Sequence, residues 1–302
     1  MRRFLATAVL ALLFGLLPIA AAHGQISLLD DEGHPLRLSG PARRIVGLGP
    51  HIAESLHAAG AGGALVGAVD YSDFPAAARR LPRVGSHGRI DLEAVVALKP
   101  DLVIGWSGGN SPAQIDRLRS LGLPVYMNRT ARLEDVARDV ERWGELAGTQ
   151  RVAQTVAGTL RARIARLRAD HADVVRLRVF YQIWRQPLMT VGGGQVISDV
   201  IALCGGGNVF ARLEALAPVV SVEAVLAADP QVIVASGIGD ERPSWLDDWR
   251  RWPTLTAVRD DNLFFIPPDL IQRHGPRLVD GAERLCAQLA TARARLAKAG
   301  GQ

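Results

Sequence analysis

Aromatic and charged side chains follow the predicted strands of this sequence at the points where the strands end. Ligands of open α/β sheets bind beyond the carboxyl ends of the strands, so side chains at these points are the first candidates for a binding site. Only 5% of the residues are aromatic, and their gathering at strand ends predicts a broad, apolar ligand with polar edges. A tryptophan in such a place can instead cap the core. The candidates are Tyr71, Trp106 and Trp184, together with Asp269, Leu270, Ile271, Gln272 and Arg273.

The seven histidines raise the question of metal chemistry. No pair has the spacing of a metalloprotease motif, and His51 and His57 fall on different faces of a helix. We expect most histidines to lie on the surface or to support other residues. His87 and His274 are exceptions, because both lie in loops at the predicted cleft and an imidazole can ligate cobalt or iron. The sequence establishes no metal site, and His87 is a candidate for a cobalt contact.

The sequence contains no convincing set of nucleophile, base and orienting acid. The glycine runs at 192–194 and 205–207 fit neither the dinucleotide-binding pattern nor the lysine-bearing phosphate loop, so we expect flexible turns there. The chain is therefore predicted to be a binding protein without a cofactor of its own and not an enzyme. A secreted α/β hydrolase is the remote alternative.

A unit made of a short helix and a buried strand occurs twice, beginning at Asp91 and at Ser221. Either residue can cap its helix through a side-chain oxygen. Glu93 and Glu223 lie in the first turns, where the helix dipole favours a carboxylate, and a proline ends each helix before its strand. The sequence thus places two equivalent carboxylates, one in each half of the chain.

Helices and strands alternate in both halves, which predicts parallel sheets covered by helices. Between the halves, apolar residues recur at helical spacings from 133 to 172. Gly144 and Gly148 are expected to separate two helices, the second a long rod that bridges the lobes. Strands are expected near 44–46, 65–69, 102–105, 125–127, 178–182, 232–235 and 263–266. The expected division is a signal peptide at 1–22, an N-terminal α/β lobe at 23–148, a linker helix at 149–175 and a C-terminal α/β lobe at 176–302.

The first residues predict export, because Arg2 and Arg3 precede an uncharged apolar run that ends in small residues at Ala22. The mature protein is expected to be soluble and unanchored, since the only cysteines are Cys204 and Cys286. In an oxidising compartment these two can form a disulfide, and two buried thiols are the alternative. The net charge of +5 falls by two when the basic leader is removed, and basic residues are spread along the chain. No nucleic-acid partner is expected.

Three segments carry a family resemblance. They are Asp-Tyr-Ser-Asp-Phe-Pro at 70–75, Ala-Leu-Lys-Pro-Asp-Leu-Val-Ile-Gly-Trp at 97–106 with Gly108-Gly109-Asn110, and Cys204-Gly-Gly with Asn208-Val-Phe210. Together they resemble the periplasmic cobalamin-binding proteins of vitamin importers, within the helical-backbone (class III) substrate-binding proteins. The resemblance covers most of the chain after the leader. It implies two Rossmann-like lobes with parallel sheets, joined by a single long interdomain helix.

The resemblance also implies a function. The protein would be a periplasmic monomer that binds cobalamin between its lobes, at Tyr71, Trp106 and 269–273, and carries it to the membrane permease subunits of an ABC importer. Cobalamin would be the transported ligand and not a cofactor.

Further implications of the resemblance concern single pairs of residues. Cys204 and Cys286 would form a disulfide. Glu93 and Glu223 match docking glutamates that pair with arginines of the permease; stabilisation of the helix ends alone is the alternative.

The chain departs from the family pattern at two positions that bear on the ligand contacts. A related protein has tryptophans where this chain has His87 and Ala217. The closest rival function is a haem or ferric-siderophore binding protein of the same fold. Haem would need an axial ligand, for which Tyr71, His87 or His274 could serve. A ferric siderophore would favour several converging arginines.

Overall fold

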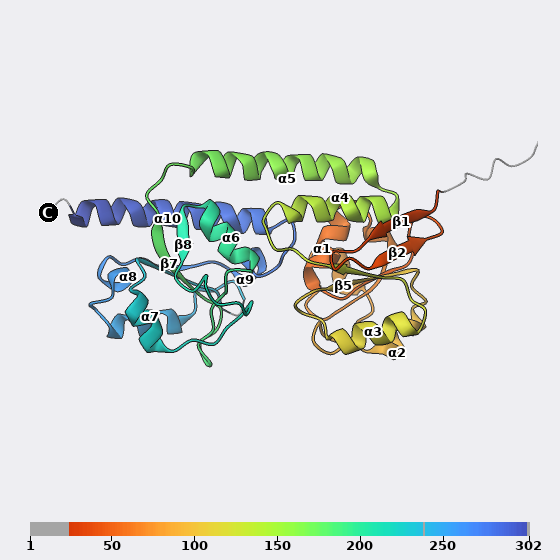
Figure 1. The fold of residues 1–302 in the computed structure, drawn as a ribbon, viewed down its shortest axis with the longest axis horizontal. Coiled ribbons are helices and arrows are strands. Elements are labelled where there is room, and N and C mark those ends of the chain that lie inside the picture. The colour runs from red at the N-terminus through yellow and green to blue at the C-terminus, as the bar shows by residue number, and fades with distance from the viewer. Residues whose placement is uncertain (1–23, 238, 301–302) are drawn as a thin grey trace, which may run out of the picture.

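The computed structural model describes residues 24–237 and 239–300 of the chain. The predicted signal peptide lies outside these residues. Within the described part, no helix is long and apolar enough to cross a membrane. The described chain forms two α/β lobes that lie side by side, with a layer of long helices along one side of both lobes (Figure 1).

The first lobe is built on a four-stranded parallel sheet in the order β4-β3-β5-β6. Its strands are apolar and buried on both faces, as expected for a parallel sheet covered by helices. An antiparallel hairpin precedes the sheet. The strands are β1 (Ile26–Leu29), β2 (Pro35–Leu38), β3 (Ile45–Gly47), β4 (Leu65–Ala68), β5 (Leu102–Trp106) and β6 (Val125–Asn128), and the helices are α1 (Pro50–Ala58), α2 (Leu92–Ala97) and α3 (Pro112–Ser120).

The second lobe repeats this plan with a parallel sheet in the order β10-β9-β7-β8. All seven strands expected from the sequence are present, and no end is shifted by more than one residue. The strands are β7 (Leu177–Gln182), β8 (Gly206–Asn208), β9 (Val232–Ala235) and β10 (Leu263–Phe265). The helices are α6 (Val196–Leu203), α7 (Val222–Ala228), α8 (Thr256–Arg259), α9 (Pro268–Ile271) and α10 (Leu278–Gly300).

Helices α4 (Asp135–Ala147) and α5 (Gln150–Asp170) connect the lobes. Helix α5 packs on α4 of the first lobe and on α10 of the second, and it spans both lobes as the bridging rod expected from the sequence (Figure 1). The expected break at Gly144 is wrong, because this glycine lies inside α4. A Cβ atom there would come within 2.2 Å of the Ala153 side chain, so Gly144 marks a close helix crossing. Gly148 ends α4 in the left-handed conformation.

The repeated unit forms α2 and α7, with the predicted caps. The Asp91 carboxylate accepts from the Ala94 amide at 3.0 Å, and the Ser221 hydroxyl accepts from the Ala224 amide at 3.1 Å. Glu93 and Glu223 are exposed in the first turns, and the pattern of buried and exposed positions is almost the same in both helices.

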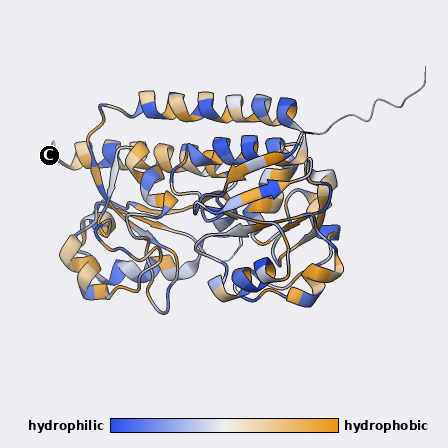
Figure 2. Cartoon of the chain, turned by 45° about the vertical axis from the view of Figure 1, so that its right-hand side comes forward, coloured by the Kyte–Doolittle hydropathy of each residue, from blue (hydrophilic) through white to orange (hydrophobic). Residues whose placement is uncertain are grey.

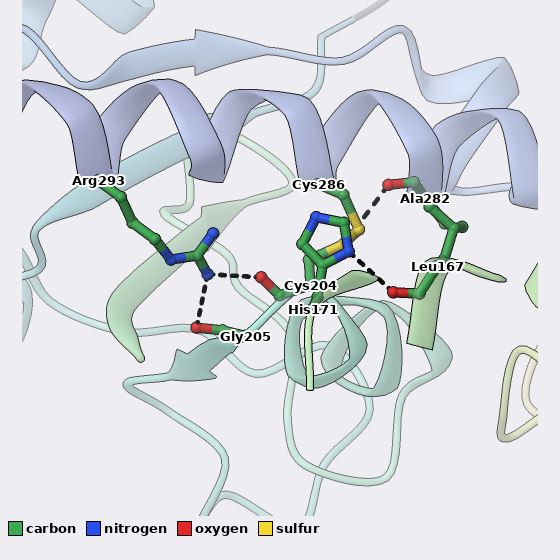
Figure 3. Close-up of a disulfide and its surroundings, with 7 residues drawn as sticks. All are labelled: Leu167, His171, Cys204, Gly205, Ala282, Cys286 and Arg293. Atoms are coloured by element: carbon green, nitrogen blue, oxygen red, sulfur yellow. Dashed lines mark hydrogen bonds between the residues drawn. A yellow bond between two sulfur atoms is a disulfide. The ribbon is translucent and has the colours of Figure 1, made fainter. Parts of the chain in front are cut away.

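The core continues from both sheets into the long helices, whose hydrophobic and hydrophilic residues alternate along the chain (Figure 2). Cys204 and Cys286 form a buried disulfide that joins the end of α6 to α10, which confirms the pairing (Figure 3). Arg293 of α10 donates to the Cys204 and Gly205 carbonyl oxygens at 2.6 and 3.1 Å. The end of α6 is therefore joined to α10 by one disulfide bond and by the hydrogen bonds of Arg293.

The expectation of a simple turn at 205–207 is partly wrong. Gly206 and Gly207 begin the edge strand β8, which pairs with β7. Two glycines in a three-residue strand give no apolar alternation, so the pairing comes from the tertiary structure and not from local preference.

Candidate ligand-binding cleft

A cavity of about 210 Å³ lies between the lobes, at the carboxyl ends of both sheets. The first lobe lines it with the segments that follow β5 and β6. The second lobe contributes the segment after β7, the start of α6, the segment between β8 and α7, and the segment after α9. The lining residues are Trp106, Ser107, Gly108, Arg129, Thr130 and Ala131 from the first lobe, and Ile183, Gly194, Gln195, Val196, Ile197, Leu216, Ala217, Gln272 and His274 from the second.

Trp106 stands at the end of β5, and its own loop makes room for it. A Cβ atom on Gly109 would lie 1.9 Å from the indole ring, so only glycine fits there. Asn110 is buried and fixes the backbone: its Oδ1 accepts from the Trp106 amide at 2.6 Å, and its Nδ2 donates to the carbonyls of Leu48 and His87 at 2.9 and 2.8 Å. The Trp-x-Gly-Gly-Asn segment thus holds the Trp106 indole in a position that faces the cavity.

Three histidines surround Trp106. The rings of His51, His87 and His274 lie with their centroids 5.2, 5.5 and 5.7 Å from the indole. His51 and His274 are buried, and their rings are 5.6 Å apart. Sequence reasoning set His51 aside, although it lies four residues beyond the end of β3, in the first turn of α1. The rule that selects residues beyond strand ends would have found it.

Burial keeps two of these imidazoles neutral. It lowers the pKa of His51 to about 3, with the nearby His274 as a second cause, and it lowers the pKa of His274 to about 4. Among the described atoms, His51 Nε2 and His274 Nδ1 have no hydrogen-bond partner. His87 is exposed, so its ring is the one of the three that solvent reaches readily.

Tyr71 and Trp184 are placed differently from Trp106. Tyr71 has a positive φ of 63° and a relative exposure of 74%, which points its ring away from the protein core. Trp184 is 40% exposed, and its neighbour Ile183 lines the cavity instead. Both rings are large apolar surfaces without cover from the chain, as a ligand-facing aromatic would be.

The segment 269–273 divides between the core and the cleft. Ile271 is fully buried, and Leu270 packs against the same core. Gln272 lines the cavity. Arg273 donates to Asp73 of the first lobe at 2.5 Å and pairs with Asp269 at 3.0 Å. The structure therefore brings Gln272, Arg273 and Asp269 to the seam between the lobes, and it directs Ile271 inward.

A buried ion pair adds to this seam. Glu54 of α1 accepts from the Arg277 Nε at 3.0 Å and from the Arg277 amide at 3.2 Å, and the Arg277 guanidinium lies 4.0 Å above the Phe74 ring. Burial alone would raise the pKa of Asp73, but the hydrogen bond and charge of Arg273 hold it below its usual value. The lobes are thus held together by ion pairs around the mouth of the cavity.

The two repeated glutamates lie on the side of the molecule opposite α5. Figure 1 shows α2 and α7 on that side, one on each lobe. Hydrogen bonds from its own amide and from Ser221 hold the pKa of Glu223 below its usual value, so it is ionised. The molecule therefore presents two exposed carboxylates in equivalent positions on its two lobes.

A family model described as periplasmic binding protein matches residues 45–270, which include both parallel sheets and every residue that lines the cavity except Gln272 and His274. The chain belongs to this family. The curated relatives include the vitamin B12-binding protein of Vibrio cholerae, which is 38% identical over 250 residues, or 82% of this chain and 90% of the relative. The vitamin B12-binding protein of Yersinia pestis is 34% identical over 275 residues, or 91% and 94%.

Solved structures of the family agree on the fold. The periplasmic vitamin B12 binding protein BtuF of Vibrio cholerae superimposes with a TM-score of 0.78 at 37% identity, over 84% of this chain and 98% of that one. A periplasmic heme binding protein from Pseudomonas aeruginosa gives 0.70 at 26% identity, over 82% and 92%. The two-lobed class III architecture expected from the sequence is confirmed.

Proposed function

We propose that this chain is a periplasmic binding protein that captures cobalamin between its lobes and delivers it to the membrane permease subunits of an ABC importer. The single observation that carries the proposal is the cleft around Trp106, whose loop residues are arranged to present that indole between the two lobes. The 38% identity to a vitamin B12-binding protein supports the choice of ligand. The protein would act as a periplasmic monomer without catalysis, cofactor or nucleic acid.

We assign the ligand contacts to both lobes. Trp106 would form the floor, with the exposed rings of Tyr71 and Trp184 as outer walls. Asp269 and Arg273 at the seam, with Gln272 in the cavity, would meet the polar edge of the ligand. Leu270 and Ile271 would support this segment from the core.

The volume of the cavity implies movement. Drug-sized ligands occupy about 300 to 1,000 Å³, and a corrinoid with its nucleotide arm is larger than most drugs, whereas the cavity holds about 210 Å³. Binding would therefore separate the lobes at the mouth and exchange the Asp73–Arg273 pair for contacts with ligand. We also propose the chain division at 1–22, 23–148, 149–175 and 176–302, with the linker around α5 as the element that limits this movement.

Titration of the purified mature protein with cyanocobalamin, haemin and a ferric siderophore tests the ligand. We expect cyanocobalamin to quench the tryptophan fluorescence with saturation, and the Trp106→Ala variant to lose most of the affinity. Tight binding of haemin without a response to cyanocobalamin would overturn the assignment and leave the fold intact. The haem alternative has some support in the exposed rings of Tyr71 and His87 near the cleft, which could ligate iron.

A further inference from the structure

A second hollow continues from the ligand cavity along α6. It has a volume of about 490 Å³ and shares Arg129, Ala131 and Gly194 with the cavity. From these shared residues it follows one face of α6, past Ser198 and Ala202, to the edge strand β8. We call it the α6 groove. A ligand held in the cavity could therefore extend an arm directly into this groove.

Three arginines line the α6 groove, and they come from both lobes. Arg129 and Arg132 follow β6 of the first lobe, and Arg176 precedes β7 of the second. Within the described chain none of the three forms an ion pair, and the one hydrogen bond of their guanidinium groups runs from Arg176 to the Gly206 carbonyl at 3.0 Å. By contrast, the nearby Arg138 pairs with three carboxylates. The groove therefore offers three guanidinium groups that no carboxylate of the described chain neutralises.

One carboxylate lies in the same groove. Asp199 of α6 accepts from the Leu133 amide at 2.9 Å, a bond that joins the segment after β6 to α6. The three guanidinium groups still outnumber it. The start of α6, at Gly194 to Ile197, lines the adjoining cavity and adds the positive end of a helix dipole. The junction of cavity and groove is therefore cationic.

Two of the four glycines that line the groove leave space above them, whereas Cβ atoms on Gly193 and Gly206 would meet the Ala211 carbonyl at 2.2 Å and the Ile201 side chain at 2.7 Å. A Cβ atom on Gly194 would meet nothing closer than Leu216 at 3.6 Å, and one on Gly207 nothing closer than the Leu177 carbonyl at 3.9 Å. Ser198 and Asn208 already bond to each other and to the Gly192 and Val191 carbonyls, so the floor needs no further partner. The arginines thus supply most of the hydrogen-bond donors in the groove that remain available to a ligand.

We propose that the α6 groove binds the phosphodiester of the nucleotide arm of cobalamin, so that the protein prefers complete cobalamins to precursors without that arm. This inference rests on the proposed function. Guanidinium groups bind phosphate oxygens through charge-assisted, often bidentate hydrogen bonds. A ferric siderophore fits less well, because its negative charge surrounds the metal, whereas Arg129 is the only arginine that lines the cavity itself.

The test compares two corrinoids and two variants. Cyanocobalamin carries the phosphodiester arm and dicyanocobinamide lacks it. The groove variant is R132Q/R176Q, which leaves the cavity-lining Arg129 in place. The control variant, R37Q/R43Q, removes the same charge at two exposed arginines that line neither the cavity nor the α6 groove and whose side chains form no ion pair within the described chain. Dissociation constants are measured by fluorescence titration at about 50 and about 500 mM salt, because exposed charges are screened over this range. Circular dichroism verifies that both variants fold.

We expect the groove variant to bind cyanocobalamin about tenfold more weakly or worse at low salt, with dicyanocobinamide unaffected and the control variant like wild type. Equal cyanocobalamin affinity in the groove variant and wild type overturns the inference. So does an equal loss for both corrinoids, or a loss confined to a ferric siderophore. If the wild-type protein binds neither corrinoid, the proposed function itself fails, an outcome that the first titration separates from failure of the groove.

Discussion

At the scale of single residues, the cleft depends on Gly109 as much as on Trp106. The indole ring occupies the space where any other residue at position 109 would place its Cβ atom, at 1.9 Å. The Gly109→Ala variant must therefore move the ring or strain the loop. Overpacking of this kind costs about 1 to 3 kcal/mol when the structure cannot relax.

We expect Gly109→Ala to weaken cyanocobalamin binding at least about tenfold, or about 1.4 kcal/mol, because the indole no longer faces the cavity. Fluorescence titration measures the affinity. Gly63→Ala is the matched control, since a Cβ atom there meets nothing within 4 Å, and it should bind like wild type. Unchanged affinity of Gly109→Ala would show that the ring position does not matter for the ligand.

His87 provides a second prediction at this scale. It is the exposed member of the three histidines around Trp106, so its imidazole could replace the exchangeable axial water of aquocobalamin; the Co–O bond breaks, a Co–N bond forms and cobalt keeps its oxidation state. We expect a shift of the absorption spectrum when aquocobalamin binds, no such shift with cyanocobalamin, and loss of the shift in His87→Ala. The same bound spectrum in wild type and His87→Ala would count against cobalt ligation.

The buried histidines make stability depend on pH. Their folded pKa values are about 3 for His51 and about 4 for His274, below the ordinary 6.5, so the unfolded chain binds more protons between pH 6.5 and 4. Stability is therefore complete above pH 6.5 and falls as the pH drops, by at most about 1.4 kcal/mol per pH unit for each histidine. Asp139, whose burial raises its pKa to about 6, acts in the opposite direction.

A comparison of wild type with His274→Gln isolates the contribution of His274 to the pH dependence of stability, because Asp139 is present in both proteins. Urea unfolding at pH 7, 6, 5 and 4 should show a smaller loss of stability in the variant. If stability fell equally with pH in both proteins, the pKa of His274 would be the same in the folded and unfolded states.

At the scale of elements, the sequence predicts what apolar runs and caps determine locally. Most strands of the two parallel sheets are short apolar runs that are largely buried, and the helices α2 and α7 begin at residues whose side chains cap them. The sequence does not predict the hairpin β1–β2, because its strands have four residues each, only alternate residues of β2 are buried, and the pairing depends on the turn between them. Strand β8 depends on tertiary packing, which no local pattern reveals.

The disulfide is the element-scale feature with the clearest energetic consequence. It closes a loop of 82 residues between α6 and α10, which in the chain-entropy model stabilises the protein by about 4 kcal/mol. We expect Cys204→Ala/Cys286→Ala to lose about this much in urea unfolding. Cyanocobalamin affinity should be retained, because neither cysteine lines the cavity. Wild type under reducing conditions is the companion measurement, and stability equal to that of the oxidised protein would contradict the account.

At the scale of the whole molecule, one side of the protein is suited to ligand exchange and docking. The long helices α4, α5 and α10 occupy one side, and α2 and α7 lie on the other (Figure 1). A stiff rod packed on both lobes allows small opening movements and resists large ones. The seam pairs Asp73–Arg273 and Glu54–Arg277 hold the lobes near each other in the structure. A partner that contacts both lobes at once could therefore favour opening.

Glu93 and Glu223 are the residues through which we expect such a partner to act. Both are exposed and occupy equivalent positions on separate lobes, so they could form two ion pairs with arginines of a two-subunit permease. Loss of one partner of an interfacial ion pair costs about 2 to 5 kcal/mol when the pair is buried by docking. The two carboxylates should thus matter for delivery and not for capture of the ligand.

An uptake experiment tests whether the two glutamates act in delivery and not in capture. It measures labelled cyanocobalamin in cells whose chromosomal copy of the gene is replaced by variants. Glu93→Gln/Glu223→Gln should reduce uptake about tenfold or more, with each single variant between the double variant and wild type, while the purified double variant binds cyanocobalamin normally. Asp170→Asn/Asp173→Asn is the control, because it removes two exposed carboxylates at the end of α5, on the opposite side of the molecule. Normal uptake by the glutamate variant would mean that Glu93 and Glu223 only stabilise the ends of their helices. Loss of cyanocobalamin binding by the purified variant would mean that they support the structure of the cleft.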